Sequence, residues 1–402
     1  MKYVIVLTDG AGDYPIEALG GKTPLEVAKM PNINHFASMG TLCLVKTVGE
    51  GLKPGSDVAN LSVMGYNPYE YYTGRSPLEA ASIGVDLSET QTAFRANTVT
   101  LSDEENYEDK TMVDYSAGEI TTEESTELIL AVKEALFGGD IDLFPGVSYR
   151  HLFTWDNAPE KFKLTPPHDI SDRKIKDYLP DNERILDLMK KSEAVLKAHP
   201  VNQRRIAEGK NPATSIWVWG EGKKPLLTSF EEKFGVKGSV VSAVDLIKGI
   251  GILAKMKSID VEGATGNLHT NFSGKAKAAA DALLKDNYDL VYVHLEAPDE
   301  CGHQGDMEGK IKSLELIDEK IVGYIREELD KAGEDYCFMI LPDHFTPIAI
   351  KTHSAENVPC VMYRKGDCNN TGYTYSEKCA DECGEYIEIG HELMDKFINM
   401  GK

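Results

Sequence analysis

Short apolar runs that end close to an acidic residue recur along the chain. Three such runs are Tyr3–Leu7, Leu290–Leu295 and Phe338–Leu341, and the acidic residues that follow them are Asp9, Asp299 and Asp343. Continuous apolar and β-branched runs are typical of strands buried on both faces, as in a parallel sheet covered by helices. Because ligands bind at the carboxyl edge of such a sheet, the pattern predicts that the three carboxylates lie together there.

Helical patterns lie between these runs. Thr23, followed by Pro24 and Glu26, has the form of a capping box, so we expect a helix to begin there. Apolar residues at helical spacing over 311–325 predict one long amphipathic helix. Further patterns predict strands at 239–242 and 359–363 and helices from 246 and over 276–284. Both ends of the chain therefore indicate α/β units.

The middle of the chain differs from its ends. From about residue 88 to about residue 205 it is richer in Thr, Glu, Asp and Pro, and Val147–Trp155 alternates as a half-buried strand does. We therefore predict a core formed by residues 1–87 and 206–402, with an inserted smaller α+β domain over 88–205. The fold class expected is α/β, with a mostly parallel sheet flanked by helices.

The net charge of the chain indicates which classes of binding partner are compatible with it. Among 402 residues, Lys and Arg total 43 and Asp and Glu total 65, which leaves a net charge of -22. This argues against nucleic-acid binding, which needs a basic surface. A small anionic substrate stays compatible, because a few arginines in a cleft can hold it. No apolar stretch approaches the ~20 residues of a membrane span.

The seven cysteines indicate a reducing compartment. Their number is odd, no CxxC pair is present and no signal sequence precedes them, so we expect a cytoplasmic protein. Cys368, Cys379 and Cys383 are close in sequence and could form a small metal knuckle, although incidental thiols are the simpler interpretation.

Asp and His residues follow the predicted strands in a pattern that suits metal binding. Asp299 and His303 are four residues apart, one helical turn, and Asp343 directly precedes His344, with His353 nine residues further on. These are the ligand types of Zn²⁺, Mn²⁺ and Mg²⁺. Each residue alone has a structural explanation, since an Asp after a strand commonly caps a helix. Their joint placement at one sheet edge favours a metal site.

Ser56 is the candidate nucleophile. It follows Pro54-Gly55, and such a serine is by itself an ordinary helix N-cap. If it shares the edge with the carboxylates, a divalent cation lowers the pKa of its hydroxyl, and a second cation polarises a phosphoryl group. A helix that begins at Ser56 would also direct its amides at a phosphate.

In combination and order, the motifs resemble the archaeal-type cofactor-independent phosphoglycerate mutases of the alkaline phosphatase superfamily. The resemblance extends from residue 3 to about residue 363. It rests on Thr8-Asp9-Gly10, Gly21–Glu26, Pro54–Asp57, Tyr72–Arg75, Ala297–Asp299, Gly302-His303, Asp343-His344, Thr346-Pro347 and His353-Ser354. It implies an alkaline phosphatase-like core and makes the inserted domain a substrate lid.

The resemblance also implies roles for individual residues. Ser56 matches the serine that becomes phosphorylated while phosphate moves between C3 and C2 of glycerate. Two divalent metal ions are implied, Mn²⁺ or Mg²⁺ with Zn²⁺ as a substitute, and no 2,3-bisphosphoglycerate is used. One ion is matched to Asp9, Ser56, Asp343 and His344, and the other to Asp299, His303 and His353.

A small phosphorylated carboxylate substrate needs cationic and polar partners, for which bidentate arginines are suited. Each candidate is also explained as an ordinary surface charge. The substrate-binding residues that we predict are Arg75, Arg150, His151, His168, Asp169, Arg204 and Arg205. Arg95 is a further arginine candidate, and Lys248 and Lys275 are weaker candidates.

Departures from the family pattern leave alternatives open. Tyr115 and Ser116 stand where the family often carries consecutive arginines, and the region from Gly366 does not match the usual ending. A bacterial branch with proposed homoserine kinases is similar in places. A homoserine kinase-like phosphotransferase, or a phosphatase, is therefore the alternative, although no Walker A sequence is present. The oligomeric state is left open.

Overall fold

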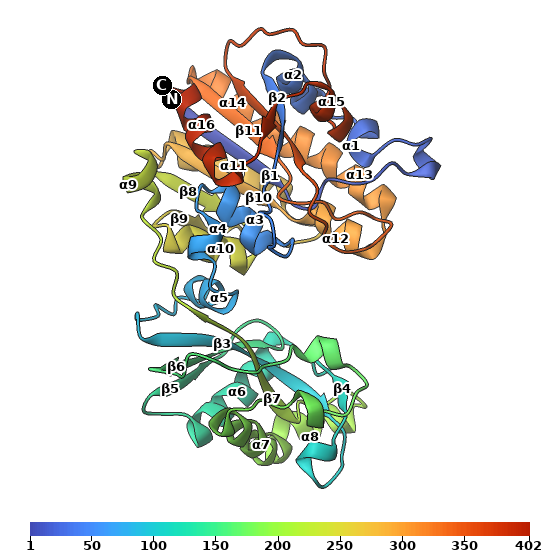
Figure 1. Cartoon of the computed structure of the whole chain (residues 1–402), viewed down its shortest axis with the longest axis vertical. Helices are drawn as coiled ribbons and strands as arrows, with labels where there is room; N and C mark the ends of the chain where they lie inside the picture. Colours follow the sequence, from blue (N-terminus) through green and yellow to red (C-terminus); the bar gives the residue numbers. More distant parts are fainter. The chain divides into compact units, whose positions relative to one another are not determined.

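The computed structural model describes residues 1–402, which form two compact units (Figure 1). The first unit comprises Met1–Tyr72 and Leu226–Lys402, and the second comprises Thr73–Pro225. Each unit has its own sheet and its own hydrophobic core. None of the helices combines the length and the apolarity that crossing a membrane requires.

The first unit is built on an eight-stranded sheet in the order β13-β2-β12-β11-β1-β10-β8-β9. All pairs of neighbouring strands are parallel except the two that involve β12, which is antiparallel to β11 and to β2. The strands are β1 (Lys2–Thr8), β2 (Thr41–Val45), β8 (Gly238–Val241), β9 (Lys257–Ile259), β10 (Leu290–Leu295), β11 (Tyr336–Leu341), β12 (Val358–Arg364) and β13 (Tyr386–Ile387).

Helices cover both faces of this sheet. Val4, Val6, Val291 and Val293 point to one face, where they pack against α2, α11 and the helical run from α13 to α14. The helices of the unit are η1 (Glu17–Leu19), α1 (Pro24–Val27), α2 (Pro31–Met39), α3 (Ser56–Val63), α4 (Pro68–Tyr71), α9 (Phe230–Phe234), α10 (Asp245–Leu253), α11 (Phe272–Leu284), α12 (Ala297–Gln304), α13 (Met307–Leu316), η5 (Ile317–Gly323), α14 (Tyr324–Ala332), α15 (Glu377–Glu382), η6 (Gly390–Glu392) and α16 (Leu393–Met400).

Two predicted helix features can be compared with the structure directly. The capping box is confirmed: the Thr23 side chain accepts from the Glu26 amide, and the Glu26 carboxylate accepts from the Thr23 amide. The predicted long amphipathic helix is a continuous helical run over 307–332, but its middle part, η5, is a π-helix. The apolar spacing does not reveal this change of winding.

The second unit contains an antiparallel sheet with β3 at its centre. β3 (Gln91–Leu101) pairs with β4 (Met112–Asp114), β6 (Arg150–Asp156) and β7 (Ser215–Lys223), and β6 pairs with β5 (Ile141–Phe144). Its helices are α5 (Ser76–Ser82), η2 (Tyr107–Asp109), α6 (Thr122–Leu136), η3 (Pro167–Ile170), η4 (Lys176–Tyr178), α7 (Glu183–Ala198) and α8 (Pro200–Ala207).

The predicted fold class is confirmed. The first unit is α/β with a mostly parallel sheet flanked by helices, and the second is a smaller α+β unit. This second unit includes α5 and β7, which lie on either side of the predicted 88–205 segment, because β7 pairs with β3 along most of its length.

Candidate active site

Three adjacent parallel strands bring the predicted carboxylates together. β1 lies between β10 and β11, so the carboxyl ends of the three strands meet at one edge of the sheet. Asp9 directly follows β1, Asp299 lies in the first turn of α12 after β10, and Asp343 comes two residues after β11. All three side chains are buried. The carboxylate edge predicted from the apolar runs is therefore present.

Ser56 lies at the same edge, but not as a helix cap. Gly55 is the N-cap of α3, and Ser56 is the first helical residue. The Ser56 Oγ lies 3.4 Å from Asp9 Oδ2 and 3.2 Å from His344 Nε2. The hydroxyl therefore faces the acidic edge from the amino end of a helix.

One group of potential metal ligands consists of Asp9, Asp343 and His344, whose ligand atoms lie within 4.8 Å of one another. The Asp343 carboxylate accepts from the Gly10 amide at 3.2 Å and from Asn60 Nδ2 at 2.9 Å. The buried Oδ1 of Asp9 has no hydrogen-bond partner. An unpaired buried carboxylate oxygen is costly, so this atom fits the role of a cation ligand.

A second group consists of Asp299, His344 and His353, again within 4.8 Å. His303 reaches the same place from the last turn of α12, with its Nε2 3.3 Å from Asp299 Oδ2 and 3.0 Å from His353 Nε2. The predicted one-turn spacing of Asp299 and His303 thus directs both side chains to one point. His344 contributes to both groups.

The three histidines present the same ring nitrogen to this centre. The Nδ1 atoms of His303, His353 and His344 lie 3.0 Å, 3.4 Å and 3.3 Å from the carbonyl oxygens of Lys351, Pro54 and Phe345. A carbonyl can only accept, so each Nδ1 carries a hydrogen and each Nε2 is directed at the centre; in His303 the Nε2 also bonds to the Asp299 carboxylate, so that ring gives up its Nε2 hydrogen when it coordinates a cation. Converging imidazole Nε2 atoms and carboxylates are the donor set of a divalent cation site.

The electrostatics of the edge favour positive charge. Burial raises the pKa of Asp9 well above its ordinary value, and the carboxylates of Asp343 and Asp299 raise it further. The hydrogen bond with Asp299 raises the pKa of His303 to about 9. Both shifts mean that this centre holds more negative charge than its surroundings compensate, which a bound cation would relieve.

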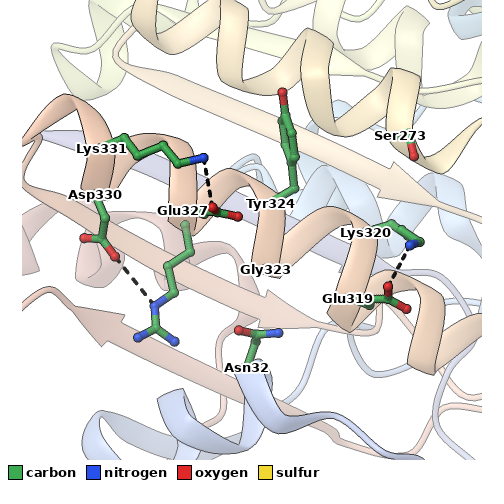
Figure 2. A pocket seen from close by; sticks show the side chains of 10 residues that line it. Asn32, Ser273, Glu319, Lys320, Gly323, Tyr324, Glu327, Asp330 and Lys331 are labelled. Atoms are coloured by element: carbon green, nitrogen blue, oxygen red, sulfur yellow. Dashed lines mark hydrogen bonds and ion pairs between the residues drawn. The ribbon is translucent and has the colours of Figure 1, made fainter.

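A pocket elsewhere on the first unit is lined by Asn32, Ser273 and charged residues of η5 and α14 (Figure 2). It includes none of the ligand groups described above. Its charges are paired within it, as Figure 2 shows for Lys320 with Glu319 and Lys331 with Glu327. We therefore place the candidate active site at the sheet edge.

Comparison with known proteins bears on the identity of this site. Residues 37–202 match the family model described as 2,3-bisphosphoglycerate-independent phosphoglycerate mutase. The chain is 47% identical to the 2,3-bisphosphoglycerate-independent phosphoglycerate mutase of Methanothrix thermoacetophila, over 99% of this chain and 100% of the relative. The chain belongs to this mutase family.

Solved structures agree with the assignment to these mutases. A protein from Pyrococcus horikoshii is 30% identical, with a TM-score of 0.83 and coverage of 99% and 97% of the two chains. The cofactor-independent phosphoglycerate mutase of Thermoplasma acidophilum is 25% identical, with a TM-score of 0.69 and coverage of 100% of both chains. The predicted resemblance to this family is confirmed.

The predicted substrate-binding residues lie in the second unit, where several already have partners. Arg204 and Arg205 of α8 both pair with Glu124, and Arg205 is buried. Arg150 begins β6 and lies over the Tyr149 ring. Arg75 is the N-cap of α5. The contact with substrate stays a prediction for all of these residues.

The remaining candidates have distinct surroundings. His151 is buried, its Nδ1 accepts from the Gly146 amide, and its Nε2 has no partner. His168 precedes Asp169 in η3 and packs against the rings of Tyr115 and Trp219. The further candidates form ion pairs or are buried: Arg95 pairs with Glu79, Lys248 pairs with Asp260, and Lys275 is buried.

Sequence reasoning did not identify the residues that support the ligands. His294 contacts Asp9, Asn60 contacts Asp343 and Thr346 contacts Asp299. His294 is a polar residue within the buried strand β10, and Asn60 is a polar residue within the buried helix α3. This polarity was the one sequence signal that could have indicated a supporting role. Their partners are 47 to 285 residues away in sequence, so only the fold identifies the contacts.

Proposed function

We propose that this chain interconverts 3-phosphoglycerate and 2-phosphoglycerate through a phosphorylated Ser56. The observation that carries the proposal is the position of Ser56 Oγ, between Asp9 and His344 at the amino end of α3. Membership of the mutase family supports the choice of substrate. The first transfer forms the bond between Ser56 Oγ and phosphorus and breaks the bond from phosphorus to the C3 oxygen. The C2 oxygen then attacks the same phosphorus, and Ser56 leaves.

Divalent cations belong to this proposal. Asp9, Ser56, Asp343 and His344 would hold one ion, and Asp299, His303 and His353 the other, as Mn²⁺ or Mg²⁺. The ions would lower the pKa of the serine hydroxyl and neutralise charge on the phosphoryl oxygens. The converging Nε2 atoms and the unpartnered Asp9 Oδ1 support two neighbouring sites that share the His344 region.

The residues of the chain orient and protect the reacting groups. Asp9 Oδ2 accepts the hydrogen bond of the Ser56 hydroxyl and thereby holds the hydroxyl beside the carboxylates of the sheet edge. The first amides of α3 stabilise negative charge that arrives at Ser56. We expect the second unit to act as a lid that excludes water, since an open phosphoserine would hydrolyse. Its arginines are the expected partners of carboxylate and phosphate.

A phosphorus NMR time course tests the proposal. The purified protein is loaded with Mn²⁺, diluted into Mg²⁺ to limit line broadening, and given 3-phosphoglycerate without nucleotide. Appearance of the 2-phosphoglycerate signal supports the mutase, and a chelator should stop it. Growth of inorganic phosphate alone would overturn the mutase in favour of a phosphatase. If the spectrum stays unchanged and a phosphorylated product forms only after ATP and homoserine are added, the kinase-like alternative is favoured.

A further inference from the structure

His294 is a fully buried histidine to which the proposed reaction gives no role. It lies next to the last residue of β10, on the face of the sheet opposite Val293. Its Nε2 lies 2.9 Å from Asp9 Oδ2, and its Nδ1 lies 3.3 Å from Ser242 Oγ. Ser242 directly follows β8, the strand beside β10. The ring therefore bridges two neighbouring strands and the Asp9 carboxylate.

The hydrogens of this bridge can be assigned from its partners. The Ser242 hydroxyl oxygen accepts from the Val244 amide at 3.0 Å, and its own hydrogen can go to His294 Nδ1 at 3.3 Å or to the Val244 carbonyl at 3.5 Å. A carboxylate only accepts, so His294 Nε2 must carry a hydrogen to bond with Asp9. A neutral ring then needs a donor at Nδ1, and the Ser242 hydroxyl is that donor.

This bridge orients the Asp9 carboxylate. Oδ2 is engaged by His294 and by Ser56, whereas Oδ1 is buried without a partner and lies 3.6 Å from His344 Nε2. A carboxylate held through one oxygen cannot rotate freely, and its other oxygen keeps one direction. A hydrogen bond to a metal ligand from a residue behind it orients that ligand, and its loss commonly changes metal affinity by about 10–100-fold.

We propose that His294 is a positioning residue: its Nε2–H holds Asp9 Oδ2, so that Asp9 Oδ1 faces the cation site formed with Asp343 and His344. The inference rests on the proposed function, because it assumes that this group binds a divalent cation. The strand end is itself fixed, since Lys275 Nζ donates to the His294 carbonyl at 3.3 Å. His294 thus links Asp9 to a rigid part of the sheet.

The test is a titration of the full chain with Mn²⁺, in which electron paramagnetic resonance measures the concentration of free Mn²⁺. His294→Leu removes the donor and should weaken one Mn²⁺ site by about 10–100-fold. His294→Gln supplies an amide N–H at a similar distance and should recover affinity to within about fivefold of the wild type. Val293→Ala on the opposite face is the matched control, which should lower the melting temperature without changing Mn²⁺ affinity.

Each outcome has one meaning. Unchanged affinity in folded His294→Leu, or equal losses in the Leu and Gln variants, would overturn the positioning role while the proposed function stands. A wild-type chain that binds no Mn²⁺ would overturn the proposed function first. If His294→Leu does not fold, Ser242→Ala replaces it, because loss of the donor to Nδ1 should also weaken Mn²⁺ binding, and unchanged binding there would overturn the assignment.

Discussion

Single residues at the sheet edge combine a chemical role with a conformational one. Ser56 begins α3 without capping it, which leaves its hydroxyl available to Asp9 and His344. Gly10 follows Asp9 with a φ of 62°, and its amide donates to Asp343. The edge therefore depends on the conformation of Ser56 and Gly10 as well as on the candidate ligands.

Replacing Ser56 by Ala should abolish the transfer of phosphate. The covalent step has no other hydroxyl at this position, so we expect kcat to fall by at least about 10³-fold. The fold and most metal binding should remain, which circular dichroism and Mn²⁺ titration will check. Ser62→Ala, a second buried serine of α3, is the matched control and should retain activity. Substantial turnover by Ser56→Ala would contradict the covalent mechanism.

Replacing Gly10 by Ala should destabilise the chain and weaken Mn²⁺ binding. A Cβ there would lie 2.5 Å from Thr346 Oγ1 and 2.6 Å from Asp299 Oδ1, in addition to the cost of the positive φ. We expect a loss of about 2–4 kcal/mol in the free energy of unfolding, measured in urea. Gly20→Ala is the control, because Gly20 has a φ of 69° and open space around it, so about 1 kcal/mol is expected there.

At the scale of elements, a residue of the π-helix η5 contacts the amino end of α2. The π-helix η5 carries Asp318, which is buried and accepts from the backbone amides of Ile33 at 2.7 Å and Asn32 at 3.3 Å, and from Asn32 Nδ2 at 3.0 Å. Figure 2 shows Asn32 beside this helical run. Because α2 has no side-chain cap of its own, a distant carboxylate satisfies the first amides of that helix.

Replacing Asp318 by Ala should therefore destabilise α2 rather than η5. Two amides at the start of α2 lose their acceptor, which should cost about 1–3 kcal/mol in the free energy of unfolding. Chemical denaturation measures the loss, and faster hydrogen exchange at the start of α2 would locate it. Glu319→Ala, an exposed neighbour, should change stability by less than about 0.5 kcal/mol. Equal effects of the two substitutions would refute the capping role.

At the scale of the first unit, a buried polar network joins four distant segments. Lys310 Nζ donates to Asp13 at 2.8 Å and to the carbonyls of Gly12 and Thr346 at 3.1 and 2.9 Å. Glu377 accepts from the Asp13 amide and from Thr23. Burial raises the pKa of Glu377 to about 7, although these hydrogen bonds and Lys310 act in the opposite direction.

The stability of the molecule should consequently depend on the titration of Glu377. The folded state holds the Glu377 proton up to about pH 7, whereas the unfolded state releases it near pH 4.5. Between these values the folded state binds more protons, so this contribution to stability is present below pH 4.5 and is lost as the pH rises through about 7. The difference between wild type and Glu377→Gln, measured by urea unfolding, should change by about 3 kcal/mol over this range. Glu382→Gln, on the same helix, should show no such change.

Much of the fold followed from local patterns. The central strands β1, β10 and β11, the capping box at Thr23 and the α+β character of the middle segment were all predictable, because burial and capping impose a local periodicity. The π-winding of η5 and the antiparallel direction of β12 were not, because the same apolar spacing serves both windings and both directions.

The linear sequence was enough to predict the carboxylates near the strand ends, Asp9, Asp299 and Asp343, and to propose Ser56, His303, His344 and His353 as their partners. The orientation of these groups depends on the folded chain. The fold placed His344 in both ligand groups, turned each Nε2 inward through carbonyl contacts, and set His294 against Asp9. The physical reason is that residue type follows from local burial and chemistry, whereas orientation depends on hydrogen bonds between segments that only folding brings together.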